Sequence, residues 1–135
     1  MADLADALRD AGLRPTRSRV AILDALAASN RAVSAQELFV AFRGKPGAPG
    51  LATVYRTLSA LAEAGAVDTF RKGDEAFFRL CRDGHHHHLV CNECGLVEEI
   101  EAEEVEAWVA RVSRRRSFTV TAHRADIFGL CASCR

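Results

Sequence analysis

Apolar positions in the first third of the chain recur every three or four residues, which predicts helices rather than strands. Gly12 ends the first of these helices, and Thr16 can cap the second. Ser34 and Glu37 form an S-x-x-E capping box, so a third helix is expected over residues 35–43. The chain therefore begins with a run of short helices.

A loop and a fourth helix are expected next. Residues 44–50, GKPGAPG, concentrate helix breakers and predict a loop. Residues 51–65 then carry Val54, Leu58 and Leu61 at helical spacing, so this helix is expected to bury one face. Its first turns are expected to turn polar side chains outward: Thr53, Tyr55, Arg56 and Thr57.

Two β-patterned segments, 67–71 and 75–80, flank the sequence KGD and predict a hairpin with Lys72 at its tip. Helices followed by a hairpin are the element order of a winged helix-turn-helix domain, whose last helix before the hairpin enters the major groove. Tyr55 can then contact a thymine methyl or a phosphate, and Arg56 a guanine or a phosphate. Contacts to the DNA backbone are expected from Arg14, Arg17, Arg19 and Lys72. A plain helical bundle with a solvated polar face explains the same pattern, because charge and periodicity do not separate the two.

The second half of the chain predicts the order strand, strand, helix, strand. Strands are expected at residues 85–91 and 96–101, and a last strand over 117–128, where apolar and polar residues alternate. The helix is expected from about residue 102 to 114, with an inward row of Val105, Trp108, Val109 and Val112. Together with the first half, this order predicts an α+β protein.

Composition narrows the class of protein without identifying it. The 135 residues are 49% hydrophobic and 27% charged, as in a folded soluble protein. Residues 1–80 hold 11 Lys and Arg against 9 Asp and Glu, and residues 81–135 hold 7 against 9, so global charge does not indicate a nucleic-acid partner. Charged residues interrupt the first helix, which excludes the apolar core of a signal peptide, and no run approaches membrane-spanning length. A cytoplasmic protein with no membrane association is expected.

The cysteines carry a specific chemical signal. One of the five, Cys81, stands alone, and the others form two CxxC pairs: Cys91 with Cys94, and Cys131 with Cys134. In a reducing compartment, paired CxxC units indicate a thiolate metal site rather than disulfides. Four thiolates make the tetrahedral shell that is typical of structural zinc, so a metal is expected to join the two ends of the small domain.

Four consecutive histidines precede the first CxxC pair, in the sequence GHHHHLVC. Side chains alternate along an extended strand, so His85 and His87 are expected to point one way and His86 and His88 the other. Two metal sites can therefore share one strand. The candidates for their remaining ligands are Cys81, Asp68, His123 and a glutamate of the following helix, and spacing does not decide among them.

The motifs LATVYRTLSALAEAG, HHHHLVCNECG and CASC follow one another along the chain. In this order and spacing the chain resembles the ferric uptake regulator family over essentially its whole length, and within that family it most resembles the zinc uptake regulators. The resemblance implies a winged-helix DNA-binding domain over residues 1–80, a hinge at 81–84 and a small α/β dimerisation domain over 85–135. It also implies a homodimer that binds operator DNA and acts on no small-molecule substrate.

Carried over residue by residue, the resemblance implies up to three Zn²⁺ ions per subunit. The structural zinc falls on Cys91, Cys94, Cys131 and Cys134. A regulatory zinc at the hinge falls on Asp68, Cys81, His86 and His88. A second regulatory zinc falls on His85, His87, Glu106 and His123, with Glu103 and Glu104 as alternatives on the same helical turn.

These ligand sets imply a zinc-responsive repressor of zinc-uptake genes, in which metal at the hinge orients the two reading helices of a dimer. One thiolate with two imidazoles and a carboxylate favours tetrahedral zinc over six-coordinate iron. An iron, nickel or peroxide sensor of the same family is the alternative, and a zinc buffer protein a further one. An enzyme is not expected, because protein ligands can close each site and the sequence contains no HExxH motif or nucleophile elbow.

Overall fold

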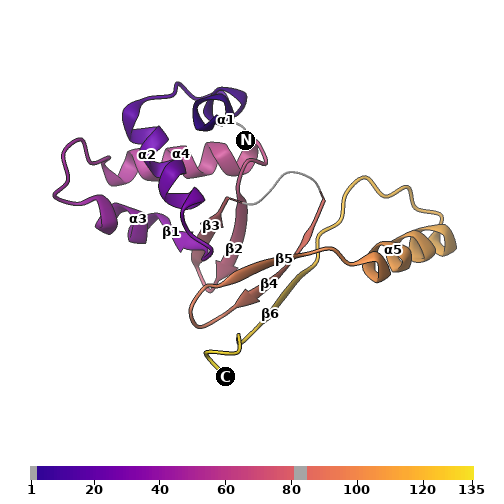
Figure 1. The fold of residues 1–135 in the computed structure, drawn as a ribbon. Helices are drawn as coiled ribbons and strands as arrows, with labels where there is room; N and C mark the ends of the chain where they lie inside the picture. Colours follow the sequence, from indigo (N-terminus) through magenta and orange to yellow (C-terminus); the bar gives the residue numbers. More distant parts are fainter. Residues whose placement is uncertain (1–2, 81–84) are drawn as a thin grey trace. The chain divides into compact units, whose positions relative to one another are not determined.

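The computed structural model describes residues 3–80 and 85–135, and the chain forms two compact units, Met1–Arg82 and Asp83–Arg135 (Figure 1). Each unit combines helix with a three-stranded sheet, which confirms the α+β class. The hinge expected at 81–84 falls outside the described residues. No helix in the described part of the chain is long and apolar enough to cross a membrane.

Helices α1 (Leu4–Asp10), α2 (Arg17–Ala27), α3 (Ala35–Phe42) and α4 (Leu51–Glu63) belong to the first unit. The start signals predicted for α2 and α3 are confirmed. Thr16 Oγ1 accepts a hydrogen bond from the backbone N–H of Arg19 at 3.3 Å. The backbone N–H of Glu37 donates to Ser34 Oγ at 3.1 Å and that of Ser34 donates to Glu37 Oε2 at 3.3 Å, which completes the capping box. The predicted loop at 44–50 contains neither helix nor strand.

The sheet of the first unit is antiparallel, with strands β1 (Val33–Ser34), β2 (Asp68–Lys72) and β3 (Glu75–Arg79) in the order β1-β3-β2. Strands β2 and β3 form the predicted hairpin, in which Lys72 pairs with Glu75 and Gly73 adopts a φ of +62° in the turn. Strand β1 was not predicted, because two residues are too few to show a period of two. Helices followed by this hairpin agree with a winged helix-turn-helix fold.

The core of the first unit gathers apolar side chains from all four helices and from β3. Helix α4 contributes Val54, Thr57, Leu58 and Leu61, the spacing of a buried helical stripe. The expected outward position of Thr57 is therefore wrong: its side chain is 0% exposed, because it lies between Val54 and Leu58 on the same stripe. Its Oγ1 has no hydrogen-bond partner within the described residues.

The second unit is built on strands β4 (His87–Cys91), β5 (Val97–Ile100) and β6 (Asp126–Gly129), in the order β5-β4-β6. Strand β4 runs antiparallel to β5 and parallel to β6. Because β4 lies between the other two, four of its five residues are buried. The register sets His88 opposite both Glu99 and Asp126, and Leu89 opposite both Glu98 and Ile127.

Helix α5 (Glu103–Arg116) forms where it was expected, with glutamates in its first turn and arginines in its last. None of its residues is buried, and Trp108, predicted to face inward, is 56% exposed. In Figure 1 the ribbon of α5 extends away from the strands of its own unit. The predicted inward row of α5 is thus at best half-buried within one chain.

The last strand is shorter than expected. Of the predicted residues 117–128, only those from Asp126 onward are in β6, and Phe118 is 73% exposed. Alternation along a sequence makes a strand only where a neighbouring strand offers hydrogen bonds. No described strand pairs with residues 117–124, so the expected strand over that segment is wrong.

Candidate metal centres and nucleic-acid surface

The four histidines separate into two pairs, as the alternation of an extended chain predicts. The ring centroids of His85 and His87 lie 4.8 Å apart, and those of His86 and His88 lie 4.6 Å apart. His87 and His88 are 2% and 3% exposed, because they lie on the central strand β4. His87 and His88 are neighbours on β4, so their side chains are directed to opposite faces of the sheet.

The first pair belongs to a cluster of four side chains. His85 and His87 meet Glu106 from the first turn of α5 and His123 from the segment before β6. Glu106 Oε1 lies 2.9 Å from His85 Nε2, 2.6 Å from His87 Nε2 and 3.1 Å from His123 Nε2. The Nε2 atoms of His85 and His123 are 3.1 Å apart. Three imidazole nitrogens and one carboxylate oxygen therefore converge on one point.

The donor chemistry of this histidine cluster fits zinc. Lone pairs on two facing imidazole nitrogens repel each other, and each also repels a nearby carboxylate. A proton or a cation between these groups removes the repulsion. In a tetrahedral site with Zn–N distances of about 2.0–2.1 Å, the donor atoms are about 3.3 Å apart. The observed separations of 2.6 to 3.1 Å are slightly shorter. These pairs of atoms would need to move apart by less than about 1 Å.

Glu106 is distinguished from the other glutamates of the helix by these contacts. Hydrogen bonds from His87 first, and then from His123 and His85, lower the pKa of Glu106 to about 2, so the carboxylate is charged at any physiological pH. Glu103 and Glu104 are exposed on the same turn. The geometry therefore favours Glu106 as the fourth donor of the histidine cluster.

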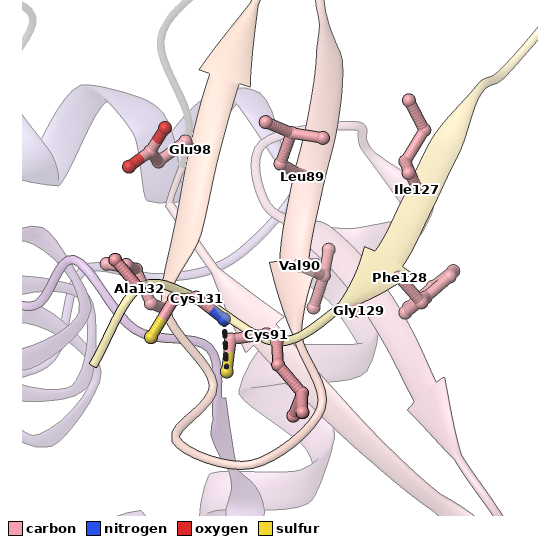
Figure 2. Close-up of a pocket in the computed structure, with 11 residues that line it drawn as sticks. Leu89, Val90, Cys91, Glu98, Ile127, Phe128, Gly129, Cys131 and Ala132 are labelled. Atoms are coloured by element: carbon pink, nitrogen blue, oxygen red, sulfur yellow. Dashed lines mark hydrogen bonds between the residues drawn. The ribbon is translucent and has the colours of Figure 1, made fainter. Parts of the chain in front are cut away.

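The four cysteines of the CxxC pairs form a second cluster. All four thiols are free, and their Sγ atoms lie within 4.8 Å of one another. Cys91 ends β4 and the other pair follows β6, so the parallel pairing of these strands brings both pairs to one end of the sheet. The backbone N–H of Cys131 donates to Cys91 Sγ at 3.4 Å (Figure 2). A tetrahedron with Zn–S distances of about 2.3 Å has an edge of about 3.8 Å, and the Sγ atoms of Cys94 and Cys131 are 3.8 Å apart.

The thiols of the cysteine cluster differ in how readily they lose a proton. Hydrogen bonds from the backbone N–H groups of Cys94 and Cys131 lower the pKa of Cys91 to about 6. The neighbouring Cys131 sulfur raises the pKa of Cys134 to about 12. Four thiolates so close together require a compensating positive charge, which a divalent cation supplies.

His86 and His88 lie among acidic side chains of the two neighbouring strands. His88 Nδ1 is 2.8 Å from Asp126 Oδ1 on β6, and His86 Nε2 is 3.5 Å from Glu99 Oε1 on β5. Sequence reasoning missed both acids. The only signal for them is the strand register, which sets Glu99 and Asp126 opposite His88 and is not readable from the sequence.

The other two ligands predicted for the hinge are Asp68 and Cys81. Asp68 begins β2 of the first unit and is half-buried. Cys81 falls outside the described residues. The hinge site as a whole therefore stays a prediction.

The predicted reading surface begins on the first turns of α4. Tyr55 is 50% exposed, Arg56 is exposed and Thr53 is half-buried, whereas Thr57 points into the core. Tyr55 and Lys72 line one groove of about 540 Å³, so the helix and the hairpin tip border the same surface. This is the relation that a winged helix needs between its reading helix and its wing.

The three predicted arginine contacts surround the start of α2. Arg14 and Arg17 are exposed, and Arg19 is half-buried. One guanidinium nitrogen of Arg19 donates to the carbonyl oxygen of Arg14 at 3.0 Å. Arg19 therefore stabilises the turn before α2, whereas Arg14 and Arg17 extend into solvent.

The second unit exposes many large apolar side chains, each at least 38% accessible: Leu89, Trp108, Phe118, Val120, Ile127, Phe128 and Leu130. Leu89 and Ile127, paired across β4 and β6, border a groove of about 280 Å³ that extends to the cysteine cluster (Figure 2). Trp108 and Phe118 border another, of about 320 Å³, along α5. Exposed apolar patches are typical of protein–protein or membrane interaction sites and of ligand-binding grooves.

Known proteins resemble the chain along most of its length. The model of the ferric uptake regulator family matches residues 10–128. A zinc uptake regulation protein of Mycobacterium tuberculosis (strain ATCC 25618 / H37Rv) is 44% identical over 126 residues, which are 93% of this chain and 97% of that protein.

Two solved structures agree with this match. The ferric uptake regulator of Vibrio cholerae has a TM-score of 0.75 and 34% identity, over 96% of this chain and all of that one. FurB from M. tuberculosis, described as a zinc uptake regulator, has a TM-score of 0.52 and 41% identity, over 98% of this chain and 100% of that one.

Proposed function

Because the chain belongs to the ferric uptake regulator family, it is a metal-responsive transcription regulator, and we propose that it represses zinc-uptake genes when zinc is bound. The observation that carries the proposal is the convergence of three imidazoles and one carboxylate in the histidine cluster, beside a separate cluster of four cysteines. Imidazole and thiolate are the donors that zinc prefers. A relative that is 44% identical is a zinc uptake regulation protein, which supports zinc as the signal.

We assign different tasks to the two clusters. Cys91, Cys94, Cys131 and Cys134 hold a structural zinc that fastens the end of β4 to the segment after β6. His85, His87, Glu106 and His123 form a regulatory site. This site connects β4 with α5, a helix that has no buried residue of its own, so occupancy of the histidine cluster orders α5.

A further regulatory site is proposed at the hinge, where Asp68 and Cys81 join His86 and His88. Asp68 belongs to the winged-helix unit and the two histidines belong to β4. Ligands from both units tie the units together, and only one arrangement of the two reading helices in a dimer matches two half-sites of DNA. A coupling free energy of about 1–3 kcal/mol between zinc and DNA changes operator affinity about 5- to 150-fold.

The occupant of the second unit's apolar surface is proposed to be a second copy of the chain. A soluble chain that exposes Trp108, Phe118 and Ile127 gains free energy by covering them. A homodimer also matches the two-fold symmetry of an operator with two half-sites. An operator-binding dimer acts where the chromosome is, so we expect it in the cytoplasm.

The proposed DNA contacts divide into two kinds. Tyr55 and Arg56, with Thr53 beside them, meet base edges from the first turns of α4. Arg14, Arg17, Arg19 and Lys72 contact phosphates and set the register of the domain. Thr57 is removed from this set because it is buried.

The proposal is tested by titrating the protein against a zinc-uptake promoter fragment at fixed salt, with free zinc or free iron(II) held at buffered concentrations. We expect tight operator binding only when zinc is present, and its loss when a chelator removes regulatory zinc. Binding that follows iron instead would assign the protein to iron sensing within the same family. Zinc binding with no operator binding under any condition would support a zinc buffer.

A matched pair of variants separates metal sensing from folding in this assay. His123→Ala removes one donor of the histidine cluster, and we expect it to shift the zinc dependence of operator binding to higher free zinc. Glu104→Gln changes an exposed carboxylate on the first turn of α5 that lies outside the histidine cluster, and it is expected to leave the zinc dependence of operator binding unchanged. Equal effects of the two would remove the histidine cluster from the regulatory mechanism.

A further inference from the structure

The sheet of the second unit holds a contact between His88 and an acidic residue that no ligand set includes. His88 Nδ1 lies 2.8 Å from Asp126 Oδ1. The side chains are 4% and 12% exposed, so the contact is shielded from water. The backbone N–H of His88 donates to the carbonyl oxygen of Ala125 at 3.3 Å, which fixes β6 beside β4 at this position.

Both oxygens of the Asp126 carboxylate are engaged. Oδ1 faces His88, and Oδ2 accepts a hydrogen bond from Nε of Arg124. A carboxylate oxygen accepts hydrogen bonds, so this contact is a hydrogen bond when the ring proton is on His88 Nδ1. In the neutral imidazole the lone pair is then on Nε2.

We propose that Asp126 is a positioning residue for the hinge zinc: it holds His88 in the Nδ1–H tautomer and so presents Nε2 as the metal-binding nitrogen. The inference rests on the proposed hinge site. Asp126 contacts the imidazole rather than the ion, and Arg124 steadies the carboxylate. A carboxylate behind a ligating histidine fixes the orientation of its ring and raises its basicity, and loss of such a partner typically lowers metal affinity about 10- to 100-fold.

The histidine cluster offers an internal contrast. His87, the residue next to His88 on β4, is as deeply buried, yet its Nδ1 has no hydrogen-bond partner within the described residues. Its Nε2 lies 2.6 Å from the Glu106 carboxylate. The two faces of β4 therefore differ: the ring of His88 is preorganised from behind, whereas that of His87 depends on its partners in the cluster.

The test compares zinc affinity of the hinge site in the full-length protein, with structural zinc retained, for wild type, Asp126→Asn and Glu98→Gln. An asparagine amide can donate to Nδ1 and so permits the Nε2–H tautomer, which cannot bind metal through Nε2. We expect hinge affinity, measured by chelator competition, to fall about 10- to 100-fold in Asp126→Asn. Glu98→Gln, an exposed acid on β5 that pairs with Leu89, is expected to match wild type.

A second readout does not depend on any variant's folding. Nitrogen NMR of the His88 ring, in wild-type protein whose regulatory sites are empty, is expected to show the proton on Nδ1. A proton on Nε2, or unchanged hinge affinity in Asp126→Asn, would overturn the positioning role.

Cys81→Ser distinguishes this failure from failure of the hinge site itself. If Cys81→Ser loses hinge zinc and Asp126→Asn does not, only the positioning role is wrong. If Cys81→Ser binds zinc as wild type does, the hinge site and the positioning role are both overturned.

Discussion

Thr57→Val replaces a buried hydroxyl that has no partner. The Thr57 side chain is 0% exposed on α4, and its Oγ1 makes no hydrogen bond within the described residues. A buried hydroxyl left unpaired is unfavourable by about 1–3 kcal/mol. Valine has nearly the same shape and a similar helix propensity, so a methyl group takes the same space. We expect the free energy of unfolding of the first unit to rise by about 1 kcal/mol or more.

The assay is amide hydrogen exchange of the core amides of α2 and α4 in the full-length protein, because it reports the opening free energy of one unit separately. For a unit of this size, about 1 kcal/mol corresponds to a rise of about 4–8 °C in Tm. Thr53→Val is the matched control, since Thr53 is half-buried on the same helix one turn earlier. It is expected to leave stability within about 0.5 kcal/mol of wild type.

Two results would refute this reasoning. Lower stability in Thr57→Val would mean that Oγ1 makes a hydrogen bond that the structure does not show. Weaker operator binding in Thr57→Val, with stability unchanged, would return Thr57 to the DNA surface and contradict its burial.

The remaining predictions concern metal, DNA and pH. Cys91→Ser is expected to lose structural zinc and to unfold the second unit, while the α4 amide signals persist. Cys81→Ser is expected to leave a folded dimer with weaker zinc-dependent operator binding. Zinc content and NMR measure both variants, and equal effects would contradict separate structural and regulatory tasks. Arg56→Ala should lower operator affinity and reduce its salt dependence without changing zinc content, and unchanged affinity would remove α4 as the reading helix. The pKa of Glu106, about 2 without regulatory metal, should move back toward its ordinary value of 4.5 in His87→Ala, as followed by carbon NMR. Because folding lowers the pKa of Glu106, this carboxylate stabilises the folded state fully above about pH 4.5, and the stabilisation is lost as the pH falls toward 2. A Glu106 carboxyl that titrates near 4.5 in wild type would refute the contact.

Local signals in the sequence predicted the first unit well because each one is satisfied within a few residues. The capping box of Ser34 and Glu37 and the KGD hairpin turn need only neighbours along the chain. The burial of Thr57 was not predicted, because a polar residue at a buried helical position has the same sequence spacing as one at the edge of the exposed face. Burial of Thr57 is decided by which neighbouring helices pack on α4.

In the candidate metal sites, too, the local pattern was predicted and the contacts between distant segments were not. Alternation along β4 predicted which histidines pair, because a period of two is a local property of extended chain. Glu99 and Asp126 were not predicted as neighbours of the histidines, because their position opposite His88 depends on how β5 and β6 pair with β4. Glu106 could be narrowed only to a helical turn, until the structure placed its carboxylate within 2.9 Å of two histidine nitrogens.

The second unit shows why the prediction for α5 was only half correct. Periodicity identifies which face of a helix is apolar, but it does not say which chain covers that face. Val105, Trp108, Val109 and Val112 do form one row, yet no residue of α5 is buried within its own unit. Phe118 and Val120 repeat the pattern in the next segment: they alternate as a strand would, yet both are exposed. The apolar face of α5 is therefore not covered within one chain, and the proposed second copy of the chain would cover it.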